Sequence, residues 1–162
     1  MGAVDYFLEL EGVDGESKDS KLKGKIEIES WSWGESNATS VGYGGGQGTG
    51  KVSMQDFHFV KRFDRASPTL ILKCADGTHI PKAVLTCRKA GTEQQTYLEI
   101  TFTKVYVSSY QTGGSGAGGI YPTDQISLSY EEIEVNYQEQ DDKGNVGKPV
   151  KTGWKLKENV KK

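Results

Sequence analysis

Alternation of apolar and polar residues is the dominant pattern of this chain, and it predicts β-strands. Near the N-terminus, Val4, Tyr6, Leu8 and Leu10 are separated by mostly polar residues. Successive side chains of a strand point to opposite faces, so such a row places one face in the core and the other in solvent. The same alternation recurs in three longer segments, 25–33, 98–107 and 126–137. We therefore expect a mainly β protein.

In each of these three segments the apolar row shifts by one position. Between residues 126 and 137, for example, the apolar positions are even up to Tyr130 and odd from Ile133 onward. In a regular strand, apolar side chains cannot move from one face to the other without a bulge, unless both faces are buried. The shifts predict strongly bent strands, as in a barrel or a sandwich. They also suggest that another molecule, such as a partner subunit, covers part of the outer face.

One segment predicts a helix. Ser67 is a candidate N-cap, and Pro68 fits a first helical residue that needs no N–H. Gly77 fits the position just after a helix end. The face directed at the core would then consist of Leu70, Ile71 and Cys74. Composition alone also allows a strand in this segment.

A glycine-rich tract over residues 42–50 nearly matches the phosphate-binding P-loop. Gly45, Gly50 and Lys51 fit the pattern, but Val52 replaces the hydroxyl residue that would bind magnesium. A P-loop also leads into a helix, whereas the residues after Lys51 alternate like a strand. We therefore predict a flexible connection between strands and no nucleotide binding.

The second glycine run, 113–119, contains the spacing Gly-x-Gly-x-x-Gly of dinucleotide-binding loops. Pro122 follows it and no helical pattern does, so we interpret it as a hairpin loop. The only histidines, His58 and His79, stand in no recognisable catalytic arrangement. We expect no catalytic residues, no cofactor and no metal site.

Charge and composition narrow the class further. The 162 residues fit a single domain, 1–162, and 20 basic residues are interleaved with 22 acidic ones for a net charge of −2. The basic doublets Lys61-Arg62 and Arg88-Lys89 are scattered, so nothing favours nucleic acid or an anionic membrane. No apolar run approaches the ~20 residues of a membrane span. The first ten residues have no basic region and no long apolar region, so we expect no classical signal peptide. Cys74 and Cys87 are predicted to be buried free thiols in a reducing compartment.

Six short motifs, in order along the chain, resemble the Hcp family, the haemolysin-coregulated proteins of type VI secretion. The resemblance runs from near the start of the chain to V-K-T-G-W-K-L near its end. The motifs are W-S-W-G (31–34), G-G-G-Q-G-T-G-K-V (44–52), Q-D-F-H-F-V-K (55–61), S-P-T-L (67–70), R-K-A-G (88–91) and S-Y-Q-T-G-G-S-G (109–116).

The resemblance implies a compact antiparallel β-barrel of two sheets with one short flanking α-helix. It also implies a structural subunit that forms stacked hexameric rings, akin to a phage tail tube, inside a contractile sheath and behind a VgrG-type spike. Small effector proteins would be carried in the lumen, with the ring as their receptor and chaperone. Such a protein starts in the bacterial cytoplasm and is secreted by this route without a signal peptide.

Two sites follow as expectations. Residues 35–50 would form an extended arm that orders against a neighbouring subunit, although the same residues could be a loop without a role. The arm's candidate contacts are Val41, Tyr43, Gly44, Gly45, Gly46 and Gln47. Because Trp31 and Trp33 share a strand face that needs burial, Ser32 would point the opposite way, toward the ring lumen.

Two other hypotheses remain at this stage. The first is a monomeric β-sandwich binding module that stacks carbohydrate on Trp31, Trp33 or Trp154. The second is a small hydrolase, which no motif supports.

Overall fold

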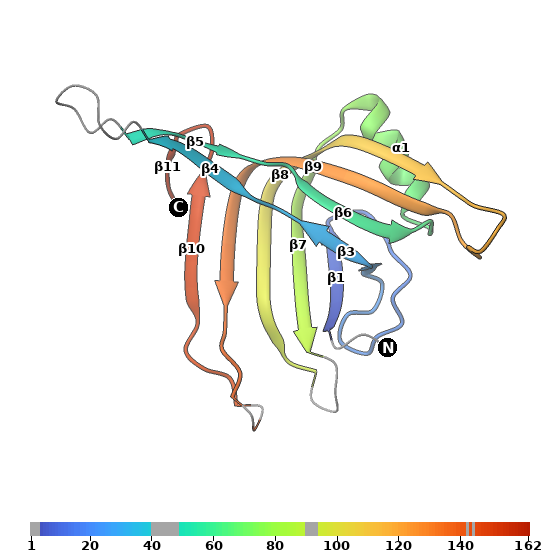
Figure 1. The fold of residues 1–162 in the computed structure, drawn as a ribbon, viewed down its shortest axis with the longest axis horizontal. Helices are drawn as coiled ribbons and strands as arrows, with labels where there is room; N and C mark the ends of the chain where they lie inside the picture. Colours follow the sequence, from blue (N-terminus) through green and yellow to red (C-terminus); the bar gives the residue numbers. More distant parts are fainter. Residues whose placement is uncertain (1–3, 40–48, 90–93, 142, 144) are drawn as a thin grey trace.

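The computed structural model describes residues 4–39, 49–89, 94–141, 143 and 145–162, and shows eleven strands and one helix. The mainly β prediction is confirmed (Figure 1). The elements are β1 (Val4–Leu10), β2 (Ile26–Ile28), β3 (Ser30–Ser32), β4 (Glu35–Thr39), β5 (Thr49–Met54), β6 (Phe57–Arg62), α1 (Ser67–Asp76), β7 (Ile80–Lys89), β8 (Thr96–Gly113), β9 (Thr123–Tyr137), β10 (Val150–Lys155) and β11 (Val160–Lys161).

Nine strands form one antiparallel sheet that folds back on itself. Its main path runs β11-β10-β9-β8-β7-β1-β2. The long strand β9 pairs with β10 along its second half and with β6 along its first half, and β6 in turn pairs with β3. The remaining two strands, β4 and β5, form a separate hairpin, which Figure 1 shows reaching away from the body.

The expected barrel of two sheets is not closed. Strands β2 and β3 bring the two ends of the folded sheet together, because β2 pairs with β1 while β3 pairs with β6. Glu29 lies between them, and its N–H donates to the carbonyl of Val60 at 2.8 Å. Among the described residues no ladder joins β3 to β1 or β2 to β6. In a closed barrel, a ladder of hydrogen bonds would join these two ends of the sheet. Here they are joined instead by the chain itself, which passes from β2 to β3 through Glu29.

The bends that the face shifts predicted are present. Lys104 has a left-handed φ of 52°, and opposite it the inward row of β9 also shifts, from Tyr130 to Ile133. On either side of this point Phe102 pairs with Ile133, and Val105 pairs with Tyr130. All four side chains are therefore buried, although each strand has changed parity. The third shift, near Ser30, corresponds to the break between β2 and β3.

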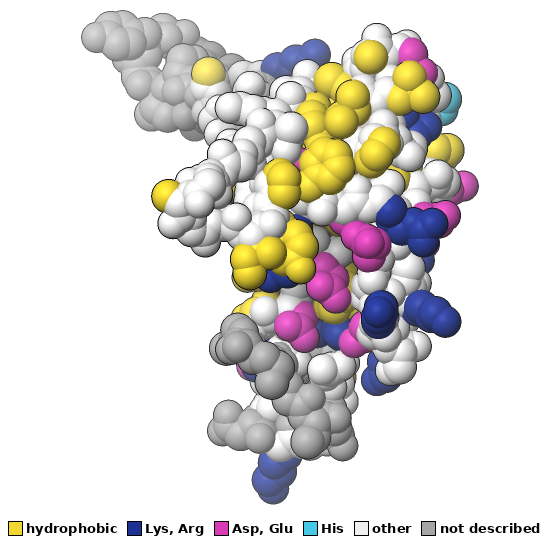
Figure 2. Space-filling model, turned by 90° about the vertical axis from the view of Figure 1, so that its right-hand side faces the viewer, with side chains coloured by type: hydrophobic (Ala, Val, Ile, Leu, Met, Phe, Trp, Pro, Cys, Tyr) yellow, Lys and Arg dark blue, Asp and Glu magenta, His cyan; other side chains and the backbone are white. Residues whose placement is uncertain are grey.

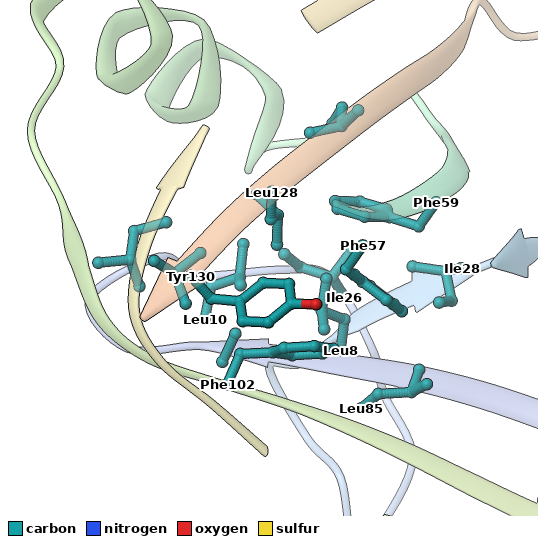
Figure 3. Close-up of a cluster of buried hydrophobic side chains, with 14 of the residues drawn as sticks. Leu8, Leu10, Ile26, Ile28, Phe57, Phe59, Leu85, Phe102, Leu128 and Tyr130 are labelled. Carbon is teal, nitrogen blue, oxygen red and sulfur yellow. The ribbon is translucent and has the colours of Figure 1, made fainter. Parts of the chain in front are cut away.

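The core lies inside the folded sheet and is rich in aromatic rings (Figure 3). Phe57 and Phe102 have ring centroids 4.9 Å apart, and Phe102 and Tyr130 are 4.8 Å apart. Leu8 and Leu85 from the neighbouring strands β1 and β7 are fully buried beside them. Each buried side chain of this size stabilises the fold by about 1.5–3 kcal/mol relative to exposure.

Helix α1 is confirmed, with corrections at its start and on its buried face. Ala66 rather than Ser67 is the N-cap, and Gly77 ends the helix with a left-handed φ of 74°. The buried face contains Ser67 and Leu70, whereas Ile71 is 43 % exposed. No described helix is long and apolar enough to cross a membrane.

Two residues of the scattered basic doublets, Lys61 and Arg88, are buried. The Lys61 ammonium is fully buried and contacts Asp124 at 3.0 Å and Asp64 at 2.7 Å. Arg88 is 2 % exposed, forms two hydrogen bonds with Asp19 and lies over the ring of Phe7. Burying a charge is costly unless it is paired. Asp124 and Asp19, both far away in the sequence, provide much of the pairing here.

The loop expected over residues 35–50 is a strand at both of its described ends. Glu35 pairs with Met54 and Asn37 with Val52, so β4 and β5 form a β-hairpin arm. The strand predicted after Lys51 is confirmed as part of β5. Residues 113–122 join β8 to β9 as the predicted hairpin connection. The sequence did not indicate β11.

Candidate functional surfaces

An uncharged surface covers the outer side of four neighbouring strands. One row of paired residues crosses β3, β6, β9 and β8, and it consists of Ser32, His58, Ser127 and Ser109. The adjacent row consists of Ser30, Val60, Gln125 and Gln111. We call these eight positions the neutral face, because none of them is Asp, Glu, Lys or Arg.

Burial of the tryptophans fixes the outward direction of Ser32. Trp31 packs against the core, with ring centroids 6.1 Å from both Tyr6 and Phe57. Trp33 also packs against the core, and its indole N–H donates to the hydroxyl of Tyr130. Since neighbours on a strand point to opposite sides, Ser32 is exposed on the outer surface.

Hydroxyl, amide and imidazole groups supply the chemistry of the neutral face. His58 Nδ1 lies 3.1 Å from the hydroxyl of Ser127, and His58 is the one ionisable side chain among the eight. Charges appear at the borders of the face. Arg62 pairs with Glu29 at 3.8 Å on one side, and Ser108 donates to Asp56 at 2.6 Å on the other. The face can therefore form neutral hydrogen bonds but few ion pairs with a partner.

A groove lies between the arm and the sheet, on the core-facing side of β9 and β10. Its volume is about 700 Å³. Val52 and Met54 of β5 line one wall, and Ile133, Val135 and Trp154 line the sheet side. The groove therefore exposes an apolar surface that the molecule's own core does not fill.

Comparison with known proteins places this geometry in a family. A family model described as "Type VI secretion system effector, Hcp" matches residues 7–137. Protein hcp1 of Pseudomonas aeruginosa is 49% identical over 160 residues, with 98% of each chain covered. The chain belongs to the Hcp family of type VI secretion proteins.

Solved structures agree with this membership. A structure described as a type six secretion system protein superposes with a TM-score of 0.94 at 34% identity, covering 99% of this chain and 100% of that one. Hcp1 from Salmonella typhimurium superposes with a TM-score of 0.83 at 35% identity, with the same coverage. This Hcp chain is accordingly a secreted structural protein of the type VI tube and not an enzyme.

The polar residues that resemble catalytic groups have structural roles in this Hcp chain. Ser67 Oγ lies 2.7 Å from the Lys61 ammonium and donates to Asp124 at 2.6 Å, an arrangement resembling an activated serine. Ser67 and both partners are fully buried, however, so no substrate reaches the hydroxyl. Burial also raises the pKa of the Cys87 thiol to about 12, which keeps it protonated and unreactive. Among the described residues no group of three His, Cys, Asp or Glu is arranged to hold a metal.

The three tryptophans of the carbohydrate-binding hypothesis lie in two different environments. Trp31 packs between core aromatics, while Trp33 and Trp154 line the groove and are partly buried.

The arm residues expected to contact a neighbouring subunit lie outside the described residues. They are Val41, Tyr43, Gly44, Gly45, Gly46 and Gln47. The structure describes only the strands on either side of them, β4 and β5.

Proposed function

We propose that this chain forms hexameric rings that stack into the inner tube of a type VI secretion machine, with the neutral face lining the lumen. Small effector proteins ride in that lumen, and the ring acts as their receptor and chaperone. The chain assembles in the bacterial cytoplasm as a single domain, behind a VgrG-type spike and inside a contractile sheath, and leaves the cell with the tube. Family membership supports this proposal at the level of the type VI tube.

The neutral face is the observation that carries the lumen assignment. A channel that passes proteins of different net charge works best with a wall that attracts neither sign strongly. Neutral hydrogen bonds contribute only about 0.5–1.5 kcal/mol each, so contacts with such a wall form and break readily. The outer side of β7 and of the part of β8 that pairs with it differs, because it presents charged residues such as Glu99 and Lys82.

The arm is the second element of the proposal. It stands apart from the main sheet, and its strands pair only with each other among the described residues. The described strands of the arm project from the body of the molecule in Figure 1. This position supports the assignment of contacts with another subunit to Val41, Tyr43, Gly44, Gly45, Gly46 and Gln47.

Native mass spectrometry of the purified chain, combined with negative-stain microscopy, tests the assembly. We expect a species of six chains and ring-shaped particles with a central opening. A protein that is monomeric at every concentration, or that forms only a two-fold dimer, would contradict the proposal.

A further inference from the structure

The apolar row inside the sheet continues past the core onto β9 and β10. Val135 pairs with Thr152, and Tyr137 pairs with Val150, on the same face as the buried Ile133. Tyr137 is 46 % exposed and Val150 is 69 % exposed, because β6 and β3 do not extend over this part of the sheet. Together with the groove above them, these residues form an uncovered extension of the core face.

A second apolar surface lies at the opposite end of the molecule, at the tip of the β8–β9 hairpin (Figure 1). Ile120 is 89 % exposed and Tyr121 is 55 % exposed. The N–H of Phe63 donates to the carbonyl of Pro122 at 2.9 Å, and the Arg62 guanidinium lies 5.0 Å from the centre of the Tyr121 ring. We call Phe63, Ile120 and Tyr121 the tip patch.

Figure 2 views the molecule from the end that carries the tip and α1. Hydrophobic side chains gather in the upper part of this face, above a band of acidic and basic ones. Leu72 of α1 is 61 % exposed and adds to the apolar surface of the molecule. The tip patch protrudes from its hairpin, whereas the groove is a hollow between the arm and the sheet.

We propose that the tip patch of one copy of this chain occupies the groove of the next copy. The two surfaces are unlike, one hollow and one protruding, and they lie at opposite ends of the same molecule. Because the two surfaces differ and lie at opposite ends, the contact can repeat head to tail from copy to copy. This inference rests on the proposed self-assembly and names the two surfaces that produce it.

Charge at the two surfaces is complementary. Glu35 lines the groove and is exposed, while Arg65 is exposed close to Phe63 in the chain. Within the described part of the chain neither side chain takes part in an ion pair. Seating the tip patch in the groove gives these two charges a partner of opposite sign on the neighbouring copy. Such rim charges select orientation and speed association more than they add affinity.

Two single substitutions test the contact. Thr152→Glu places a charge in the groove, and Ile120→Glu places one on the tip patch; both positions are exposed, so each variant folds. We expect each variant alone to melt like the wild type and to lose assembly, with at least a roughly tenfold lower assembled fraction. The matched controls are Lys151→Glu, on the opposite face of β10, and Ala117→Glu, elsewhere on the same hairpin tip. Both controls should assemble normally.

Mixing the two assembly-deficient variants gives the decisive result. The Ile120→Glu chain keeps an intact groove and the Thr152→Glu chain keeps an intact tip patch, so one contact remains and native mass spectrometry should show a 1:1 dimer. Variants that assemble like the wild type, or a mixture that stays monomeric, would overturn the inference while leaving the proposed function standing. A wild-type chain that is itself monomeric would contradict the proposed function.

Discussion

Burial of a single lysine couples β6, α1 and β9. The Lys61 ammonium contacts Asp64, Asp124 and the hydroxyl of Ser67, which belong to three different segments. The side chains of Lys61 and Asp124 have no exposed surface. Removing one partner of such a pair leaves an uncompensated buried charge.

We therefore expect Lys61→Met to lower the free energy of unfolding by about 3–5 kcal/mol. The neighbouring Arg62→Met is the matched control, because Arg62 is exposed and its pair with Glu29 is long, at 3.8 Å. The control should cost no more than about 1 kcal/mol. Chemical denaturation of the two variants measures both values. Equal, small losses would show that the buried pair does not stabilise the fold.

Asp19 makes part of the stability depend on pH. Its hydrogen bonds from Arg88 and from the backbone of Lys21 lower the pKa of the carboxyl from 3.8 to about 2. A lowered pKa in the folded state means that this stabilisation is complete above pH ~4 and is lost as the pH falls toward 2.

In unfolding titrations between pH 6 and 2, we therefore expect the wild type to be more stable than Asp19→Asn at the upper end, and the difference to shrink as the pH falls. A difference that stays constant over this range would contradict the assigned role of the ionised carboxylate.

At the residue scale, the sequence indicated the buried apolar residues better than the buried charged ones. Leu8 and Phe102 follow from alternation, and both are buried. Lys61 and Arg88 looked like ordinary surface cations because their partners, Asp124 and Asp19, are far away in the sequence. The outward direction of Ser32 was predictable, since it depends only on the adjacent tryptophans. Which outward face lines a channel is a property of the assembly and cannot be read from one strand.

At the scale of elements, the shift in apolar parity was an informative signal. It predicted the bend at Lys104 because both β8 and β9 must change face at the same place to keep the core filled. Strand β4 was missed, since Glu35–Thr39 reads E-S-N-A-T and has no apolar row. An arm that lies away from the core has no face to bury, so the pattern that reveals strands is absent there.

The arm should be separable from the body in stability. At Gly50 an added Cβ would overlap the carbonyl oxygen of Ala38 on the paired strand. We expect Gly50→Val to disrupt the hairpin and reduce assembly, while thermal melting of the isolated subunit changes little because the core is untouched. Gly113→Val is the control, since nothing lies within 4 Å of a Cβ there. A large drop in the melting temperature of Gly50→Val would show that the arm belongs to the folding core.

At the scale of the whole molecule, the β class and the family could be predicted from the sequence, but the incomplete closure of the sheet could not. The gap at Glu29 depends on which strands pair with β2 and β3, and alternation contains no information about pairing partners. The groove and the tip patch could not be predicted either, because they arise where the sheet extends beyond its covering strands.

The neutral face predicts a specific effect on cargo. Ser32→Gln enlarges a side chain that points into the proposed lumen, so rings should keep their mass and melting temperature while less effector co-purifies with them. Ser20→Gln, an exposed position outside the neutral face, is the control. The amount of effector that co-purifies with the wild type should change little with added salt. Salt screens ion pairs, and the neutral face forms few of them. Strong loss of cargo at high salt would contradict neutral recognition.

The most direct test of the central claim is an electron cryo-microscopy reconstruction of the assembled chain. The account predicts a six-membered ring whose channel wall is formed by β3, β6, β9 and β8, with Ser32, Gln111 and Gln125 facing the opening. A ring whose channel is lined by the charged outer side of β7, or by the arm alone, would contradict it.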